Sequence, residues 1–205
     1  MSIVRDSVGS KKNIILVGDF GAGKTSLLHR FINKEFTKIF NNTNLDFYSY
    51  EMKHKEELLQ VFIWDSLGHE RFQSMTDSFY KKANGVILVL DLTDEENVSV
   101  ISKWISTVND NCKDNIPIII VGNKRDICFN HEKKMKELND SIPKSKNISK
   151  IMSASAKTGD NVDELFKKII VSAFEKTSPD VQSTIKNKNY QTVDQVETNW
   201  CCFLL

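Results

Sequence analysis

The sequence predicts an α/β protein with three layers, in which helices cover both faces of a six-stranded, mostly parallel sheet with one antiparallel edge strand. Three observations lead to this prediction. Short apolar runs alternate with amphipathic stretches along most of the 205 residues, as in consecutive strand–helix units. The runs are almost continuously apolar, as in strands buried on both faces. Two extended segments follow one another directly, which predicts one antiparallel hairpin at a sheet edge.

Each element is placed by its own pattern. Four apolar runs are expected to form the buried strands: residues 14–17, 85–91, 117–121 and 148–152. Two further extended segments, 46–53 and 58–64, flank a charged turn and form the hairpin. Apolar residues recur with helical spacing in the segments between strands. The expected helices are residues 26–33, 95–108, 131–139 and 162–174.

The chain divides into one folded domain with two short ends. All strand and helix patterns lie in residues 12–175, preceded by a short N-terminal extension, residues 1–11. The apolar periodicity stops near residue 175, so residues 176–205 are interpreted as a flexible tail.

Charge and composition exclude several classes of protein. The 28 Lys and Arg residues balance 27 Asp and Glu residues to a net charge of +1, which argues against nucleic-acid binding through a basic field. Lysine pairs such as Lys11–Lys12 and Lys81–Lys82 are spread along the sequence and are interpreted as solvated faces. No run approaches the roughly 20 apolar residues of a membrane helix. The four cysteines are spaced as neither a disulfide framework nor a metal site, which predicts a reducing compartment.

A glycine-rich turn after the first strand fits a phosphate loop. Residues 18–25 read GDFGAGKT, the pattern G-x-x-x-x-G-K-[ST]. The glycines let backbone N–H groups point inward, and the next helix adds its positive N-terminal end. Lys24 is expected to reach the β- and γ-phosphates, and the Thr25 hydroxyl to bind Mg²⁺. An ordinary glycine turn is the alternative, but the strand before and the helix after the motif argue against it.

Three further motifs follow predicted strands. Asp65 and Gly68 form D-x-x-G, in which the carboxylate can hold a metal and the glycine N–H can approach a phosphate. Residues 123–126 read NKRD, and the Asp126 carboxylate can accept the N1–H and 2-amino donors of guanine, which adenine lacks. In the third motif, residues 155–157 (SAK), the Ala156 N–H can donate to the guanine O6.

Together, in this order, these four motifs resemble those of a small GTPase of the Ras superfamily, a P-loop NTPase, and the likeness covers about residues 12–175, the expected G domain. Several features are similar to the Rab branch, namely Trp64-Asp65, Glu70-Arg71-Phe72, Phe79-Tyr80 and the sequence LVLDLT at 88–93. The resemblance implies a membrane-anchored switch in vesicle trafficking that binds GTP and GDP with Mg²⁺. The implied partners are an exchange factor, a GTPase-activating protein, prenylation machinery and effectors. The protein is expected to be a monomer and to bind no nucleic acid.

The resemblance also assigns site residues. Thr43 is the expected switch residue that senses the γ-phosphate, because it lies 43 − 24 = 19 residues after Lys24, a spacing similar to that of the family. The alternative, Thr37, lies too early in the sequence. The implied metal ligands are Thr25, Thr43 and Asp65, and the implied catalytic residues are Lys24, Thr43 and His69. The implied GTP-binding residues are Gly18, Asp19, Phe20, Gly21, Ala22, Gly23, Lys24, Thr25, Ser26, Thr43, Gly68, Asn123, Lys124, Asp126, Ser155, Ala156 and Lys157.

The chain departs from this family at two positions that matter for hydrolysis. His69 stands where the family carries the Gln that orients the attacking water, and Phe20 stands where it carries a small residue. Positioning and electrostatics supply nearly all the catalysis of phosphoryl transfer, so slow hydrolysis is expected. Two alternatives stay open. One is a GTP-binding, effector-recruiting module with essentially no hydrolysis; in the other, Phe20 lies flat on the switches, His69 is an exposed loop residue, and hydrolysis is merely slow. An ATP-using kinase is disfavoured by Asn123 and Asp126.

The last residues predict a lipid anchor. Cys202-Phe-Leu-Leu fits C-a-a-X with a terminal Leu, which predicts geranylgeranylation, and Cys201 offers a second lipid site. One chain anchors only marginally, and no polybasic cluster precedes it. The expected location is the cytoplasmic face of an intracellular membrane, with a cytosolic pool.

Overall fold

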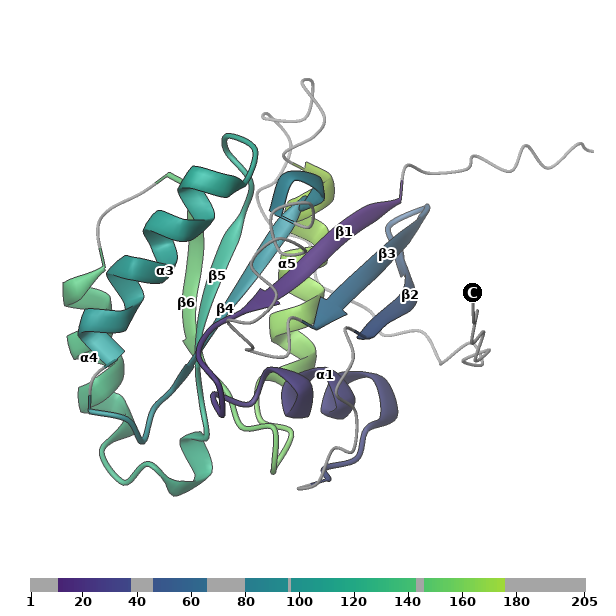
Figure 1. Cartoon of the computed structure of the whole chain (residues 1–205). Helices are drawn as coiled ribbons and strands as arrows, with labels where there is room; N and C mark the ends of the chain where they lie inside the picture. The colour runs from purple at the N-terminus through teal and green to yellow at the C-terminus, as the bar shows by residue number, and fades with distance from the viewer. Residues whose placement is uncertain (1–10, 38–45, 66–79, 96, 143–145, 176–205) are drawn as a thin grey trace, which may run out of the picture.

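A computed structural model describes residues 11–37, 46–65, 80–95, 97–142 and 146–175 (Figure 1). Six strands form one sheet in the order β2-β3-β1-β4-β5-β6. Only the β2–β3 pair is antiparallel, so the predicted mostly parallel sheet with an antiparallel edge strand is confirmed. The strand bounds are β1 Lys12–Val17, β2 Asp46–His54, β3 Glu57–Asp65, β4 Gly85–Asp91, β5 Ile118–Asn123 and β6 Ile148–Ser153.

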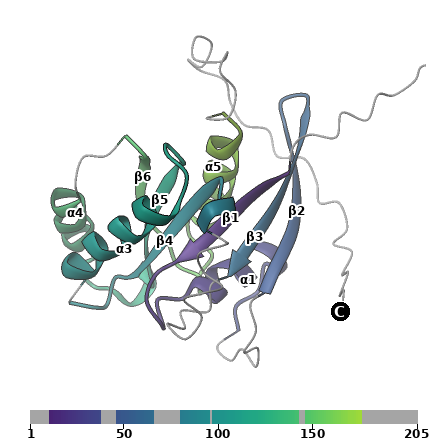
Figure 2. The same ribbon diagram turned by 45° about the horizontal axis from the view of Figure 1, so that its top comes forward.

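Helices cover both faces of this sheet. α1 and α5 lie against one face, and α3 and α4 against the other, while the β2–β3 hairpin stands at the edge (Figure 2). The helix bounds are α1 Lys24–Asn33, α3 Asn97–Asn111, α4 His131–Ser141 and α5 Val162–Glu175, with a short 3-10 turn at Arg125–Ile127. None of the helices in the described part of the chain is long and apolar enough to cross a membrane.

Two hydrophobic cores explain why the strand sequences are continuously apolar. Successive side chains of a strand point to opposite faces, so Ile14 and Leu16 of β1 enter the core under α1 and α5. Ile15 and Val17 enter the core under α3 and α4. In the first core the Phe31 and Phe166 rings stack with centroids 4.3 Å apart, which joins α1 to α5.

Several element boundaries differ from the sequence prediction by one to three residues, and two of these differences have local reasons. α1 begins at Lys24, two residues earlier than predicted, because Gly23 takes a left-handed conformation (φ 95°) that ends the loop there. β5 begins after Pro117, which has no N–H to donate to the ladder, and continues to Asn123. The predicted tail and residues 1–10 of the predicted N-terminal extension lie outside the described residues.

Candidate functional site

Three loops meet at the carboxyl ends of β1, β5 and β6, at the bottom of Figure 1, and Asn123 joins them. The Asn123 side chain is 1% exposed. Its Nδ2 donates to the Ala22 carbonyl oxygen (2.8 Å), and its Oδ1 accepts from the Ala156 N–H (3.2 Å). A Cβ at Gly23 would lie 2.3 Å from Nδ2, so only glycine permits this approach. One buried amide therefore holds the glycine-rich loop, the NKRD motif and the SAK motif in one place.

The glycine-rich loop wraps around the ammonium group of Lys24. The Lys24 Nζ donates to the carbonyl oxygens of Gly18 (2.7 Å) and Asp19 (2.8 Å), and the residue is 4% exposed. Burial lowers the pKa of Lys24 to about 8, against the opposing influence of the Asp65 and Asp19 carboxylates. A buried ammonium group that donates to two loop carbonyl oxygens is well placed to receive an anion such as a phosphate.

Thr25 and Asp65 form a pair of oxygen donors beside this loop. The Thr25 Oγ1 donates to Asp65 Oδ2 at 2.5 Å. Asp65, at the end of β3, is 1% exposed and lies level with Leu16 of the neighbouring β1. A hydroxyl and a carboxylate are hard ligands that fit Mg²⁺, which takes few protein groups and keeps several waters. No cluster of three or more His, Cys, Asp or Glu side chains suited to a metal occurs within the described ranges.

The NKRD and SAK motifs form a polar wall next to Asn123. Asp126 Oδ1 accepts a hydrogen bond from the Ser155 hydroxyl (2.6 Å), and Asp126 Oδ2 lies 3.7 Å from the Lys157 Nζ. The carboxylate is thereby held in one orientation, with an acceptor-only group facing the site. This geometry suits a planar ligand edge that presents donors.

Lys124 is positioned from strand β4. Its Nζ lies 2.6 Å from Asp91 Oδ2, at the end of that strand. Burial raises the pKa of Asp91, but hydrogen bonds from Lys124 and Thr93 outweigh this effect and leave the pKa below its usual value. The ammonium end of Lys124 is therefore held at the carboxyl end of β4.

Sequence reasoning missed three residues that position the site. Arg30 of α1 donates through Nε to the Ala156 carbonyl (2.7 Å) and through Nη2 to that of Lys157 (2.5 Å), which clamps the SAK loop to the first helix. The Trp104 indole of α3 donates to Asp19 Oδ1 (3.0 Å). Asp91 had a signal in the sequence, a carboxylate directly after a buried strand; Arg30 and Trp104 had none.

The structure brings most of the predicted residues together. Phe20 lies in the glycine-rich loop with its side chain 78% exposed, and Ser26 is in the first turn of α1 beside Lys24 and Thr25. The Ala156 N–H, predicted to reach a guanine oxygen, bonds here to Asn123. Five predicted residues lie outside the described ranges: Thr43, Gly68, His69, Cys201 and Cys202.

Comparison with known proteins agrees with this arrangement. The model of the Ras family matches residues 13–175. The chain is 36% identical over 162 residues to Ras-related protein SEC4 of Saccharomyces cerevisiae, covering 78% of this chain and 74% of that protein. It is 31% identical over 172 residues to Ras-related protein Rab-12 of Mus musculus, covering 83% and 70%. It is 32% identical over 177 residues to Ras-related protein RabC of Dictyostelium discoideum, covering 85% of each.

Proposed function

Because the chain belongs to the Ras family and is a Rab-like small GTPase, we propose that it is a Mg²⁺-dependent GTP/GDP switch in vesicle trafficking. The expected G domain, residues 12–175, binds the nucleotide where the three loops meet. Residues 1–11 precede it, and residues 176–205 carry the anchor. Its hydrolysis of GTP is slow.

The observation that carries guanine-nucleotide binding is the double hydrogen bond of Asn123. It places the phosphate loop and the two base-recognising motifs at fixed distances from one another. Asp126, oriented by Ser155, then accepts from the N1–H and the 2-amino group of guanine. Adenine presents an acceptor and no amine at those atoms, so the base would cover the carboxylate without supplying a donor to it, and discrimination on the order of 10⁴-fold follows.

The phosphates take the place of the loop carbonyls around Lys24. The ammonium group then balances the charge of the β- and γ-phosphates, and the loop N–H groups donate to their oxygens. Thr25 and Asp65 are the described residues that would hold Mg²⁺, with Thr43 as the third proposed ligand. When bound, the ion neutralises charge that develops on the phosphates. Gly68 supplies a further N–H.

Slow hydrolysis rests on His69 and Phe20. A shorter, rigid imidazole in place of a Gln amide alters the position of the attacking water. The largely exposed Phe20 ring stands in the phosphate loop, where an arginine supplied by a GTPase-activating protein would have to approach; such an arginine contributes about 10³–10⁵ in rate. A module that recruits effectors with essentially no hydrolysis is the second candidate, favoured by the same two residues.

The proposed location is the cytoplasmic face of an intracellular membrane, with a cytosolic pool. Cys202, and with it Cys201, carries the prenyl anchor; exchange factors, activating proteins, effectors and the prenylation machinery are the partners. Cys202→Ser is expected to move the protein to the cytosol, and unchanged membrane fractionation would refute the anchor.

The deciding experiment has two parts. Competition binding with GTP and ATP tests the base site, and stronger ATP binding would overturn it. Single-turnover hydrolysis on GTP-loaded protein, with His69→Gln and Phe20→Ser alongside, tests the chemistry. A slow wild type that both substitutions accelerate supports the switch with impaired hydrolysis. A wild-type rate typical of unassisted small GTPases would refute the steric reasoning, and no measurable turnover would favour the second candidate.

A further inference from the structure

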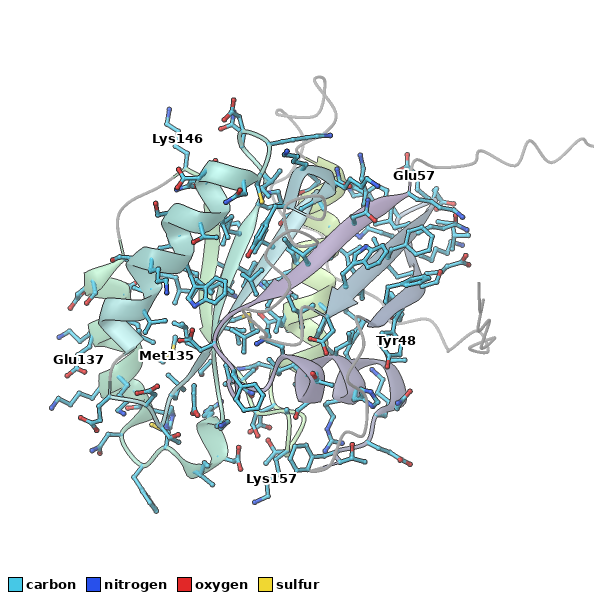
Figure 3. All side chains as sticks on the ribbon, in the orientation of Figure 1. Tyr48, Glu57, Met135, Glu137, Lys146 and Lys157 are labelled. Carbon is cyan, nitrogen blue, oxygen red and sulfur yellow. The ribbon has the colours of Figure 1, made fainter. Side chains whose placement is uncertain are left out.

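The end of the sheet opposite the nucleotide loops has a different electrostatic character. The amino end of β1, the carboxyl end of α3 and the carboxyl end of α5 all lie in the upper part of Figure 1. Lys146 is at this end and Lys157, of the SAK motif, is at the other (Figure 3). Five exposed lysines occupy it, and we call them the basic end: Lys11, Lys81, Lys82, Lys113 and Lys146.

The lysines come from four separate parts of the sequence, and short contacts bring them together. The Asn13 Nδ2 donates to the Lys82 carbonyl (3.3 Å), which ties the start of β1 to the segment before β4. Burial lowers the pKa of Lys12, and the nearby charge of Lys113 lowers it further. Lys113 in turn lines a surface cavity with Asn147, the neighbour of Lys146.

The charge of the basic end is little neutralised within the molecule. Lysines elsewhere, such as Lys34, Lys124 and Lys150, lie within 3.1 Å of carboxylate oxygens. Across the described ranges, none of the five lysines of the basic end forms an ion pair with a carboxylate. Acidic residues at this end include Asp114, Glu175 and Glu57, which begins β3 (Figure 3).

The same end is where the chain leaves the folded domain. The Lys12 Nζ lies 5.7 Å from the centre of the Phe174 ring, one residue before α5 ends at Glu175. Thirty residues follow, 176–205, and the proposed lipid sites are close to their end. The segment that carries Cys201 and Cys202 therefore follows the folded domain from the corner that carries the lysines.

We propose that the basic end is a docking surface for an anionic lipid bilayer, which orients the domain with its nucleotide loops away from the membrane. The occupant is a bilayer because the chain runs from this end toward the proposed anchor, and because ammonium groups that form no ion pair with a carboxylate within the described ranges complement anionic headgroups. Each lysine near an anionic leaflet strengthens binding by about fivefold, and salt weakens the effect. The choice of a bilayer as the occupant rests on the proposed membrane anchor. The test therefore uses unlipidated protein, so that binding through the basic end is measured apart from the anchor.

The experiment is co-sedimentation of the full, GDP-bound, unlipidated chain with vesicles. Phosphatidylcholine vesicles containing about 30% phosphatidylserine are compared with pure phosphatidylcholine at low salt. Two triple variants are compared, each changing the net charge from +1 to +1 − 6 = −5. The patch variant carries Lys81→Glu, Lys82→Glu and Lys113→Glu. The control variant carries Lys103→Glu, Lys133→Glu and Lys136→Glu, at exposed positions of α3 and α4.

The wild type is expected to bind the anionic vesicles at low salt. Its binding to neutral vesicles, and its binding to anionic vesicles at about 0.5 M salt, should each be at least tenfold weaker. The patch variant should bind at least tenfold more weakly than the control variant, while both retain GDP and unfold at the wild-type temperature. Equal binding by the two variants, or no preference of the wild type for anionic vesicles, would overturn the proposal. Neither result bears on the lipid anchor, because fractionation of Cys202→Ser tests the anchor separately. Binding of the wild type to an acidic protein but not to vesicles would also overturn the proposal that the basic end docks on a bilayer.

Discussion

Replacing Asn123 with alanine should separate the three loops of the nucleotide site. The substitution removes the donor to the Ala22 carbonyl and the acceptor for the Ala156 N–H, at a side chain that is 1% exposed. Each buried group left without its partner costs about 1–3 kcal/mol. The free energy of unfolding is therefore expected to fall by about 2–6 kcal/mol, which corresponds to a drop of about 4–24 °C in Tm for a domain of this size.

The loss should appear in nucleotide binding as well as in stability, because the loops are no longer fixed relative to one another. Thermal unfolding in excess GDP measures the loss of stability. Displacement of a fluorescent GDP analogue measures the loss of nucleotide binding, and release of the analogue should be at least tenfold faster than from the wild type. Asn33→Ala is the matched control, since Asn33 is an exposed helix residue whose Nδ2 contacts the His29 ring (3.3 Å), and it should cost within about 0.5 kcal/mol. If both variants behave alike, Asn123 does not join the loops.

Three other substitutions test other parts of the structure. Between pH 8 and 10.5 the unfolded chain binds more protons at Lys24 than the folded chain, since burial lowers the folded pKa to about 8 from 10.5; nucleotide-free protein should therefore gain up to about 3 kcal/mol of stability across this range. Urea unfolding should show no such gain in Lys24→Met, and parallel pH profiles would contradict the assignment. Asp126→Ala should weaken GTP binding on the order of 100-fold or more while ATP binding is unchanged; competition titration checks this, and an unchanged GTP/ATP ratio would exclude Asp126 from base recognition. Phe166→Ala, which removes a fully buried ring stacked on Phe31, should cost about 3–5 kcal/mol in urea unfolding, and a loss below about 1 kcal/mol would show that α5 is not held by this pair.

Elements with a local cause were predictable from the sequence. The strand predicted at residues 85–91 matches β4 (Gly85–Asp91). A continuous apolar run of this length is buried on both faces when it forms a central strand between two layers of helices. The edge hairpin was equally readable from two adjacent extended segments. The helix after the phosphate loop was placed two residues late, since the sequence pattern does not show that Gly23 adopts a left-handed conformation and ends the loop.

The candidate site was predictable in its motifs but not in its connections. Lys24, Asp65 and Asp126 were identified because phosphate and base chemistry requires those side chains at fixed places after strands. Arg30 and Trp104 were not, because each acts on a loop far away in sequence, at residues 156–157 and 19 respectively. No spacing rule connects such pairs.

The sequence by itself determined the class of fold, the family and the chemistry expected at each loop, since these depend on patterns within a few residues. The tertiary structure decided how the parts combine. It made Asn123 the link between three loops, and it gathered lysines that look dispersed along the sequence, such as Lys11, Lys82 and Lys113, at the end from which the chain continues. Sheet order brings the amino ends of parallel strands together regardless of their separation in sequence, and that is why the basic end exists only in the folded molecule.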